Sequence, residues 1–160
     1  MKGTIEKYLP SVVYGGSDGA VTTFAVMAGA VGAGIDARVV IILGLANLFS
    51  DGFSMASADY LSEDSRIGEN KKTALRDAYA TFASFVIVGF VPIIPILFFV
   101  REKAFLYSSI FTLITFAVIG YSRAKILKRD PLRLATQSVA IGTICAIIAY
   151  AVGEYISRLV

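Results

Sequence analysis

Five long stretches of mostly apolar residues dominate the chain, and short polar or charged segments separate them. A helix needs about 20 apolar residues to cross the hydrocarbon core of a bilayer. We therefore predict an all-α, polytopic membrane protein that forms a single domain over residues 1–160. Its five transmembrane helices are expected at residues 12–35, 37–60, 78–100, 104–121 and 132–156.

Polar and helix-breaking residues indicate how these helices are connected. Asp36 separates the first two stretches, and its side chain suits the N-cap of the second helix, which predicts a tight antiparallel hairpin. Pro92 and Pro95 interrupt the backbone hydrogen bonds of the third helix and predict a kink or a break there. Small residues such as Gly15 and Gly19, four residues apart in the first stretch, favour close helix packing.

Composition strengthens the membrane prediction and excludes several classes of function. Hydrophobic residues make up 56% of the chain and charged residues 17%, whereas soluble domains are about half apolar and about a quarter charged. The chain has no histidine and one cysteine, Cys145, which excludes Ser/His/Asp triads, HExxH sites and an intrachain disulfide. We therefore expect neither an enzyme nor a permanently bound cofactor.

The distribution of basic residues predicts the orientation. The net charge of +3 does not indicate a nucleic-acid partner, because the basic residues separate apolar stretches instead of forming one soluble face. With five spans, 11 of the 15 Lys and Arg residues lie on the side of the N-terminus. Since basic loops mark the cytoplasmic side, we predict a cytoplasmic N-terminus and a multi-pass protein, in the cell membrane if the source is prokaryotic.

Carboxylates inside the apolar stretches are the candidate functional groups. A charged side chain at mid-membrane costs about 2.5 to 3.5 kcal/mol on insertion scales, so such residues usually face a cavity or a partner. At about 1.5 Å per residue, the predicted depths are about 9 Å for Asp18, about 13 Å for Asp51 and about 8 Å for Met55. Side chains from the two helices of the hairpin are therefore expected to meet around a cation.

The second stretch carries a polar stripe, because Asn47, Asp51, Met55 and Asp59 follow one another at intervals of four residues. Taken alone, Met55 is typical of a residue that fills the core. Together with Asp18 and Asp51, it offers oxygen and sulfur ligands that suit Fe²⁺ or Mn²⁺ better than Mg²⁺ or Ca²⁺.

Further acidic residues are interpreted more simply. We expect Asp59, Glu63, Asp64 and Glu69 to belong to a solvated, charged segment toward or in the second loop, with a cation-attracting entrance as the alternative. Glu154, near the end of the last stretch, is predicted to be an interfacial residue; the alternative is a group that handles protons.

Two segments carry a resemblance to a known family. The stretch YGGSDGAVTTFAVMAGAVGAG, followed by GLANLFSDGFSMASADYL, resembles the first helix pair of the vacuolar iron transporter family, with its SDG and SM motifs. GFVPIIPILF is similar to the proline-broken third helix of that family, and AIIAYAVG is similar to its fifth. The resemblance therefore extends over nearly the whole chain.

This resemblance implies five spans, a cytoplasmic N-terminus, a homodimer with the ion pathway between the subunits, and exchange of Fe²⁺ or Mn²⁺ for protons. It assigns the metal-binding aspartate of the first helix to Asp18 and the methionine of the second to Met55. Many members have a glutamate where this chain has Asn47, and Asp51, one turn further on, is expected to replace it. The plant-type cytoplasmic domain is missing, since only residues 61–77 fill that position.

The sequence thus predicts a homodimeric transporter that exports Fe²⁺, and also Mn²⁺, from the cytoplasm in exchange for protons. Its predicted metal ligands are Asp18, Asp51 and Met55, with Asn47 as a helper. The alternative is a membrane subunit or scaffold that transports nothing and whose intramembrane aspartates pair with a partner protein.

Overall fold

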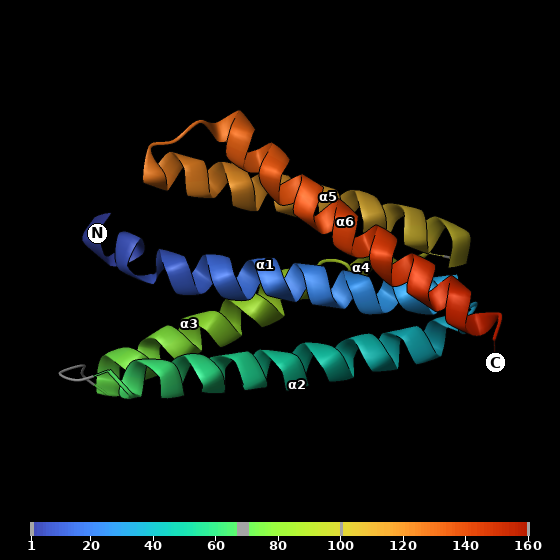
Figure 1. The fold of residues 1–160 in the computed structure, drawn as a ribbon, viewed down its shortest axis with the longest axis horizontal. Coiled ribbons are helices and arrows are strands. Elements are labelled where there is room, and N and C mark those ends of the chain that lie inside the picture. The colour runs from blue at the N-terminus through green and yellow to red at the C-terminus, as the bar shows by residue number, and fades with distance from the viewer. Residues whose placement is uncertain (1, 67–70, 100, 160) are drawn as a thin grey trace.

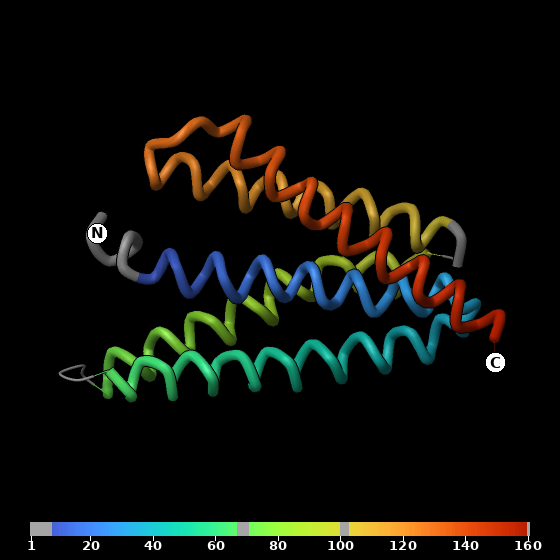
Figure 2. Tube along the Cα trace, in the orientation of Figure 1, coloured from blue at the N-terminus to red at the C-terminus, as the bar shows by residue number. Residues whose placement is uncertain are grey.

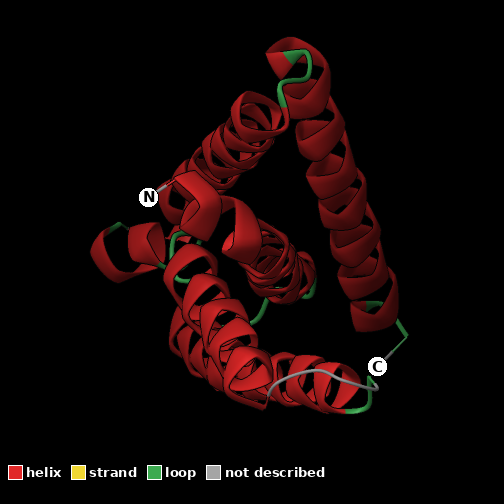
Figure 3. Ribbon diagram, turned by 90° about the vertical axis from the view of Figure 1, so that its left-hand side faces the viewer, coloured by secondary structure: helices red, strands yellow, loops and turns green. Residues whose placement is uncertain are grey.

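A computed structural model of the protein describes residues 2–66, 71–99 and 101–159. These residues form helices and connecting turns, without any strand (Figures 1 and 3), which confirms the predicted all-α class. The helices are α1 (Lys2–Gly32), α2 (Ala37–Asp64), α3 (Lys71–Gly89), α4 (Ile94–Phe98), α5 (Arg101–Leu127) and α6 (Pro131–Ser157).

The helices run back and forth along the long axis of the molecule. Successive passages are made by α1, by α2, by α3 together with α4, by α5 and by α6, and the two termini lie at opposite ends (Figure 2). The N-terminus, the end of α2, the start of α3 and the α5–α6 connection share one end (Figure 1). α1 lies centrally and packs against α2, α3, α5 and α6.

The predicted hairpin between the first two helices is confirmed. The chain reverses over residues 33–36, where Gly34 has a positive φ of 72°, a conformation that glycine adopts without steric cost. The Ile35 amide donates to the carbonyl oxygen of Ala30 at 2.9 Å. The Asp36 side chain caps α2 by accepting a 2.9 Å hydrogen bond from the Arg38 amide.

The predicted break in the third passage is also confirmed. α3 ends at Gly89, a turn follows, and the short α4 carries the chain onward. Pro92 and Pro95 are both buried in this segment. The Ser108 hydroxyl of α5 donates a 2.7 Å hydrogen bond to the carbonyl oxygen of Pro92, so a neighbouring helix satisfies a backbone group that the break leaves free.

Glycines on α1 allow two neighbouring helices to approach closely, as their spacing predicted. A Cβ atom added to Gly19 would lie 3.0 Å from the Cα atom of Phe85 in α3. A Cβ atom added to Gly32 would lie 2.5 Å from the carbonyl oxygen of Tyr150 in α6. Both distances are too short for a side chain, so these contacts are made backbone to backbone.

Length and apolarity identify three helices that could cross a membrane among the described residues: Ala37–Asp64, Lys103–Leu127 and Pro131–Ser157. α1 and α3 are not among them. Both contain glycine, serine and threonine, which lower mean hydropathy, and α3 begins with Lys71 and Lys72. The multi-pass class is therefore shown, whereas the count of five spans and the orientation stay predictions.

Candidate functional site

The polar stripe predicted for α2 lies at the edge of the packed face of that helix. Asn47, Asp51, Met55 and Asp59 are all half-buried. The buried face of α2 consists of five residues at intervals of four, namely Val40, Gly44, Leu48, Gly52 and Ala56. The last three of these directly follow Asn47, Asp51 and Met55 in the sequence. Since successive helical residues are about 100° apart, the stripe lies beside the core and is partly open.

Asp18 of α1 and Asp51 of α2 lie at the same level of the hairpin. Asp18 lies 15 residues before Ala33, where the turn begins, and Asp51 lies 15 residues after Asp36, where the turn ends. The carboxyl groups of Asp18 and Asp51 are both half-buried. Like charges so placed in an apolar surrounding favour the binding of a cation or a proton between them.

An open hollow of about 560 Å³ lies beside Asp51. Asn47 and Asp51 provide its amide and its carboxylate, and the hydroxyl groups of Ser50 and Ser54 add further oxygen atoms. Val26, Leu43 and Ala46 complete the lining. Asp18 and Met55 do not line this hollow, so only two of the four predicted ligands, Asn47 and Asp51, share it.

Two buried polar atoms near the hollow have no hydrogen-bond partner within the described part of the chain: Thr23 Oγ1 and Asn47 Nδ2. Thr23 lies 10 residues before the turn and Asn47 lies 11 residues after it, so they are also nearly level in the hairpin. Buried polar groups normally have partners. The Thr23 hydroxyl and the Asn47 amide are therefore two further polar groups, about one helical turn closer to the connection than Asp18 and Asp51.

Met55 contacts the hydrophobic core as well as belonging to the stripe. It packs against a buried cluster formed by α1, α2, α3 and the turn before α4, comprising Met27, Ala30, Val40, Leu48, Phe85 and Ile93. Among the described residues, no three His, Cys, Asp or Glu side chains come together as a metal-binding group. One chain therefore supplies two neighbouring carboxylates but not a complete set of acidic ligands.

One of the acidic residues that were predicted to lie in a solvated, charged segment lies elsewhere. Asp59 is not part of a solvated segment, because it lies on α2 and accepts a 2.6 Å hydrogen bond from the Thr81 hydroxyl of α3. Glu63 and Asp64, at the end of α2, form ion pairs with Arg66 at 3.3 Å and with Lys71 at 4.0 Å. Glu69 lies outside the described residues.

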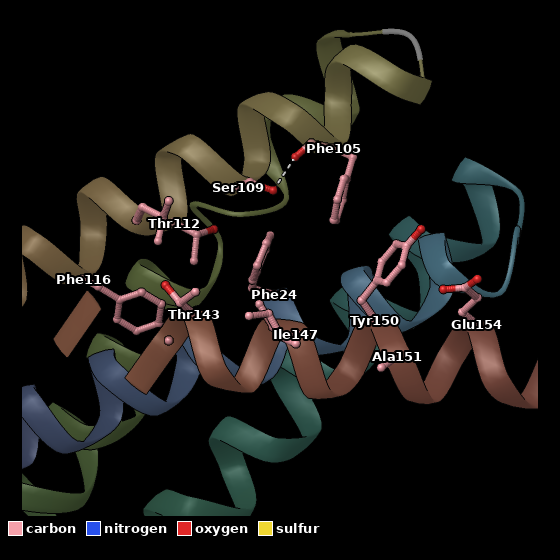
Figure 4. A pocket seen from close by; sticks show the side chains of 13 residues that line it. Phe24, Phe105, Ser109, Thr112, Phe116, Thr143, Ile147, Tyr150, Ala151 and Glu154 are labelled. Atoms are coloured by element: carbon pink, nitrogen blue, oxygen red, sulfur yellow. Dashed lines mark hydrogen bonds between the residues drawn. The ribbon is translucent and has the colours of Figure 1, made fainter. Parts of the chain in front are cut away.

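A second hollow, of about 380 Å³, lies between α1, α5 and α6 (Figure 4). The rings of Phe24, Phe105 and Tyr150 surround it, and successive ring centroids are 6.1 and 6.3 Å apart. Glu154, at one end, forms an ion pair with Arg158 on the next turn of α6. The interfacial role of Glu154 stays a prediction.

Comparison with known proteins identifies the family of the chain. A family model described as the VIT family matches residues 9–68 and 63–154. The chain belongs to the VIT family. It is 46% identical over 59 residues to a vacuolar iron transporter of Toxoplasma gondii, a match that covers 37% of this chain and 20% of the relative. It is 32% identical over 84 residues to vacuolar iron transporter 1 of Eucalyptus grandis, which covers 52% and 34% of the two chains.

The predicted family is thus confirmed, and the first VIT match, over residues 9–68, includes Asp18, Asn47, Asp51 and Met55. A relative in Plasmodium berghei, also a vacuolar iron transporter, is 40% identical over 60 residues, which is 38% of this chain and 22% of the relative. These matches span only about a fifth to a third of the relatives' own lengths.

Some polar members of the site were missed by sequence reasoning. Ser50 and Ser54 lie three residues after Asn47 and after Asp51, which places them on the same side of α2. That spacing is visible in the sequence, but serine alone is too common in apolar helices to indicate a site. Thr23 gave no signal either, because its burial without a partner depends on how α1 packs.

Proposed function

We propose that this VIT family member is a membrane transporter that exports Fe²⁺, and also Mn²⁺, from the cytoplasm in exchange for protons. The observation that carries the proposal is the placement of two half-buried carboxyl groups, those of Asp18 and Asp51, at the same level of the α1–α2 hairpin. Two carboxylates in such surroundings are costly unless a cation or a proton offsets their charge. The names of the relatives support iron as the transported ion.

The proposed ligands are Asp18, Asp51 and Met55, with the Asn47 amide as a helper. Carboxylate oxygens and a thioether sulfur together suit a borderline first-row ion. Metal binding needs deprotonated carboxylates, so protons and metal ions compete for the same atoms. A proton that binds from one side then releases the metal ion, which is a sufficient physical basis for exchange.

A homodimer would complete this site. The hollow is open, and Ser50 and Ser54 are exposed beside a half-buried Asp51. Polar side chains in membrane helices usually face a protein interior or a water-filled cavity, because contact with lipid is unfavourable. A second copy placed over the hollow would cover these groups and would add its own Asn47 and Asp51 to the ligands.

The proposed orientation follows from where the basic residues lie in the fold. Arg66, Lys71 and Arg76 lie at the end of α2 and the start of α3, and Arg123 and Arg129 lie near the α5–α6 connection. These positions share the end of the molecule that holds the N-terminus (Figure 1). We propose that all five passages cross the bilayer and that this basic end is cytoplasmic.

The test is Fe²⁺ flux into liposomes that contain the purified protein, with and without a pH gradient. We expect gradient-dependent flux that Asp18→Asn and Asp51→Asn each abolish. Asp36→Asn is the matched control, because asparagine caps a helix as well as aspartate and the position lies outside the site. A native protein that moves neither Fe²⁺ nor Mn²⁺ would contradict the proposal and would favour the scaffold alternative.

A further inference from the structure

An apolar groove of about 430 Å³ lies between α1, α3 and α5. Val12 and Gly16 of α1, Val88 of α3, and Val118 and Ile119 of α5 form most of its walls. α5 and α6 diverge from α1 toward the end of the molecule that holds the N-terminus (Figure 1). This groove is separate from the hollow beside Asp51, which involves α2 and Val26.

A basic side chain, that of Arg123, lies close to the α5 residues that line the groove. Ile119, Ser122 and Ile126 line the groove, and Arg123 lies on the same side of α5, one turn from Ile119 and from Ile126. Arg123 is half-buried. Among the side chains described at residues 8–66, 71–99 and 103–159, none forms an ion pair or a hydrogen bond with its guanidinium group.

We propose that this groove binds an anionic phospholipid, with one acyl chain along its walls and the phosphate group paired with Arg123. The walls are almost entirely apolar, which suits an acyl chain and not a hydrated solute. A guanidinium group binds phosphate through parallel hydrogen bonds. Arg123 lies among the basic residues at this end of the molecule, which the proposed orientation puts at the level of the cytoplasmic lipid headgroups.

The absence of tryptophan from the chain permits a direct test. Val118→Trp places a single fluorophore in the groove, and Ile144→Trp places one on the exposed side of α6, where Ile144 is 57% exposed. Each variant is reconstituted in vesicles that contain brominated phosphatidylglycerol or brominated phosphatidylcholine, and quenching of fluorescence reports contact with each lipid. Thermal unfolding checks that both variants are folded.

At Val118→Trp we expect phosphatidylglycerol to be preferred about fivefold over phosphatidylcholine, which corresponds to about 1 kcal/mol for one basic residue near the surface. Adding Arg123→Gln should remove that preference, whereas Arg133→Gln, at an exposed basic residue of the same end, should preserve it. At Ile144→Trp the two lipids should quench equally. Equal quenching by both lipids in the groove would overturn the proposal, and so would protection from both, which would indicate a second protein chain there.

Discussion

The hydroxyl group of Thr81 on α3 donates a 2.6 Å hydrogen bond to the Asp59 carboxylate on α2. Thr81 is fully buried and Asp59 is half-buried, so this bond joins the polar stripe to the core. A hydrogen bond to a charged group contributes about 1.5 to 3 kcal/mol. We expect Thr81→Val, which keeps the shape and removes the hydroxyl group, to lower the free energy of unfolding by about that amount, measured by thermal unfolding in detergent.

Thr81→Ser provides the matched control, because it retains the hydroxyl group and removes one methyl group. It should recover most of the stability that Thr81→Val loses. Equal losses in both variants would show that the methyl group, and not the bond to Asp59, stabilises the contact between α2 and α3.

Two adjacent glycines of α1 should respond differently to the same substitution. A Cβ atom on Gly15 would lie 2.5 Å from Ser84 Oγ and 3.0 Å from the carbonyl carbon of Thr81, which cannot move freely. On Gly16 it would lie 3.2 Å from a terminal methyl group of Val88. Overpacking costs about 1 to 3 kcal/mol, so Gly15→Ala should lower Tm clearly and Gly16→Ala only slightly.

The order of these two effects is the informative result, and thermal unfolding of both variants measures it. Gly16→Ala also removes a flexible residue from a helix, which by itself stabilises. A Gly16→Ala variant less stable than Gly15→Ala would contradict the close approach of α1 and α3 at Gly15.

Metal-dependent stability offers a test of the proposed ligands that does not depend on transport. A ligand that binds only the folded protein at 100 times its Kd adds about 2.7 kcal/mol. We expect Mn²⁺ or Fe²⁺ to raise the Tm of the native protein, and Asp18→Asn or Asp51→Asn to lose that rise. Without metal, each variant should unfold no earlier than the native protein, because an amide in place of a half-buried carboxylate removes the cost of a charge in an apolar surrounding.

Met55→Leu separates the thioether from the packing role of that residue. The exchange keeps the volume that fills the space beside the core cluster, so metal-free stability should change by less than about 1.5 kcal/mol. If sulfur is a ligand, as proposed, the rise in Tm with Fe²⁺ should shrink. A full rise would assign Met55 to the core alone.

Crosslinking tests whether a second copy covers the open hollow. In a Cys145→Ser background, Ser54→Cys provides one thiol at an exposed position of that hollow. We expect oxidation in membranes to yield a disulfide-linked dimer, because two copies of α2 would face each other there. Ile144→Cys on α6, also exposed, is the control, and equal crosslinking at both positions would contradict a dimer built on this hollow.

Much of the fold could be predicted from local chemistry. Asp36 caps α2, and the prolines break the third passage, because each effect depends on residues close in sequence. The helix ends were less accurate. α2 continues to Asp64 and α5 to Leu127, since backbone hydrogen bonding extends beyond the apolar stretch that was used to define each span.

The site was predicted in part, because periodicity indicates which residues share a side of a helix but not which helix covers that side. The stripe on α2 and the level of Asp18 follow from spacing and from the tight turn. The bond from Thr81 to Asp59 could not be predicted, since it depends on how closely α3 approaches α2. The burial of Thr23 depends in the same way on the packing of other helices against α1.

The most direct test of metal and proton exchange at Asp18 and Asp51 is proton movement driven by the metal alone. Vesicles that contain the protein and an internal pH indicator start without a pH gradient, and Fe²⁺ is added outside with the membrane potential clamped. The account predicts that the lumen becomes more alkaline as Fe²⁺ enters and protons leave, and that Asp51→Asn stops both movements. Entry of Fe²⁺ without any change of luminal pH would contradict exchange at these carboxylates.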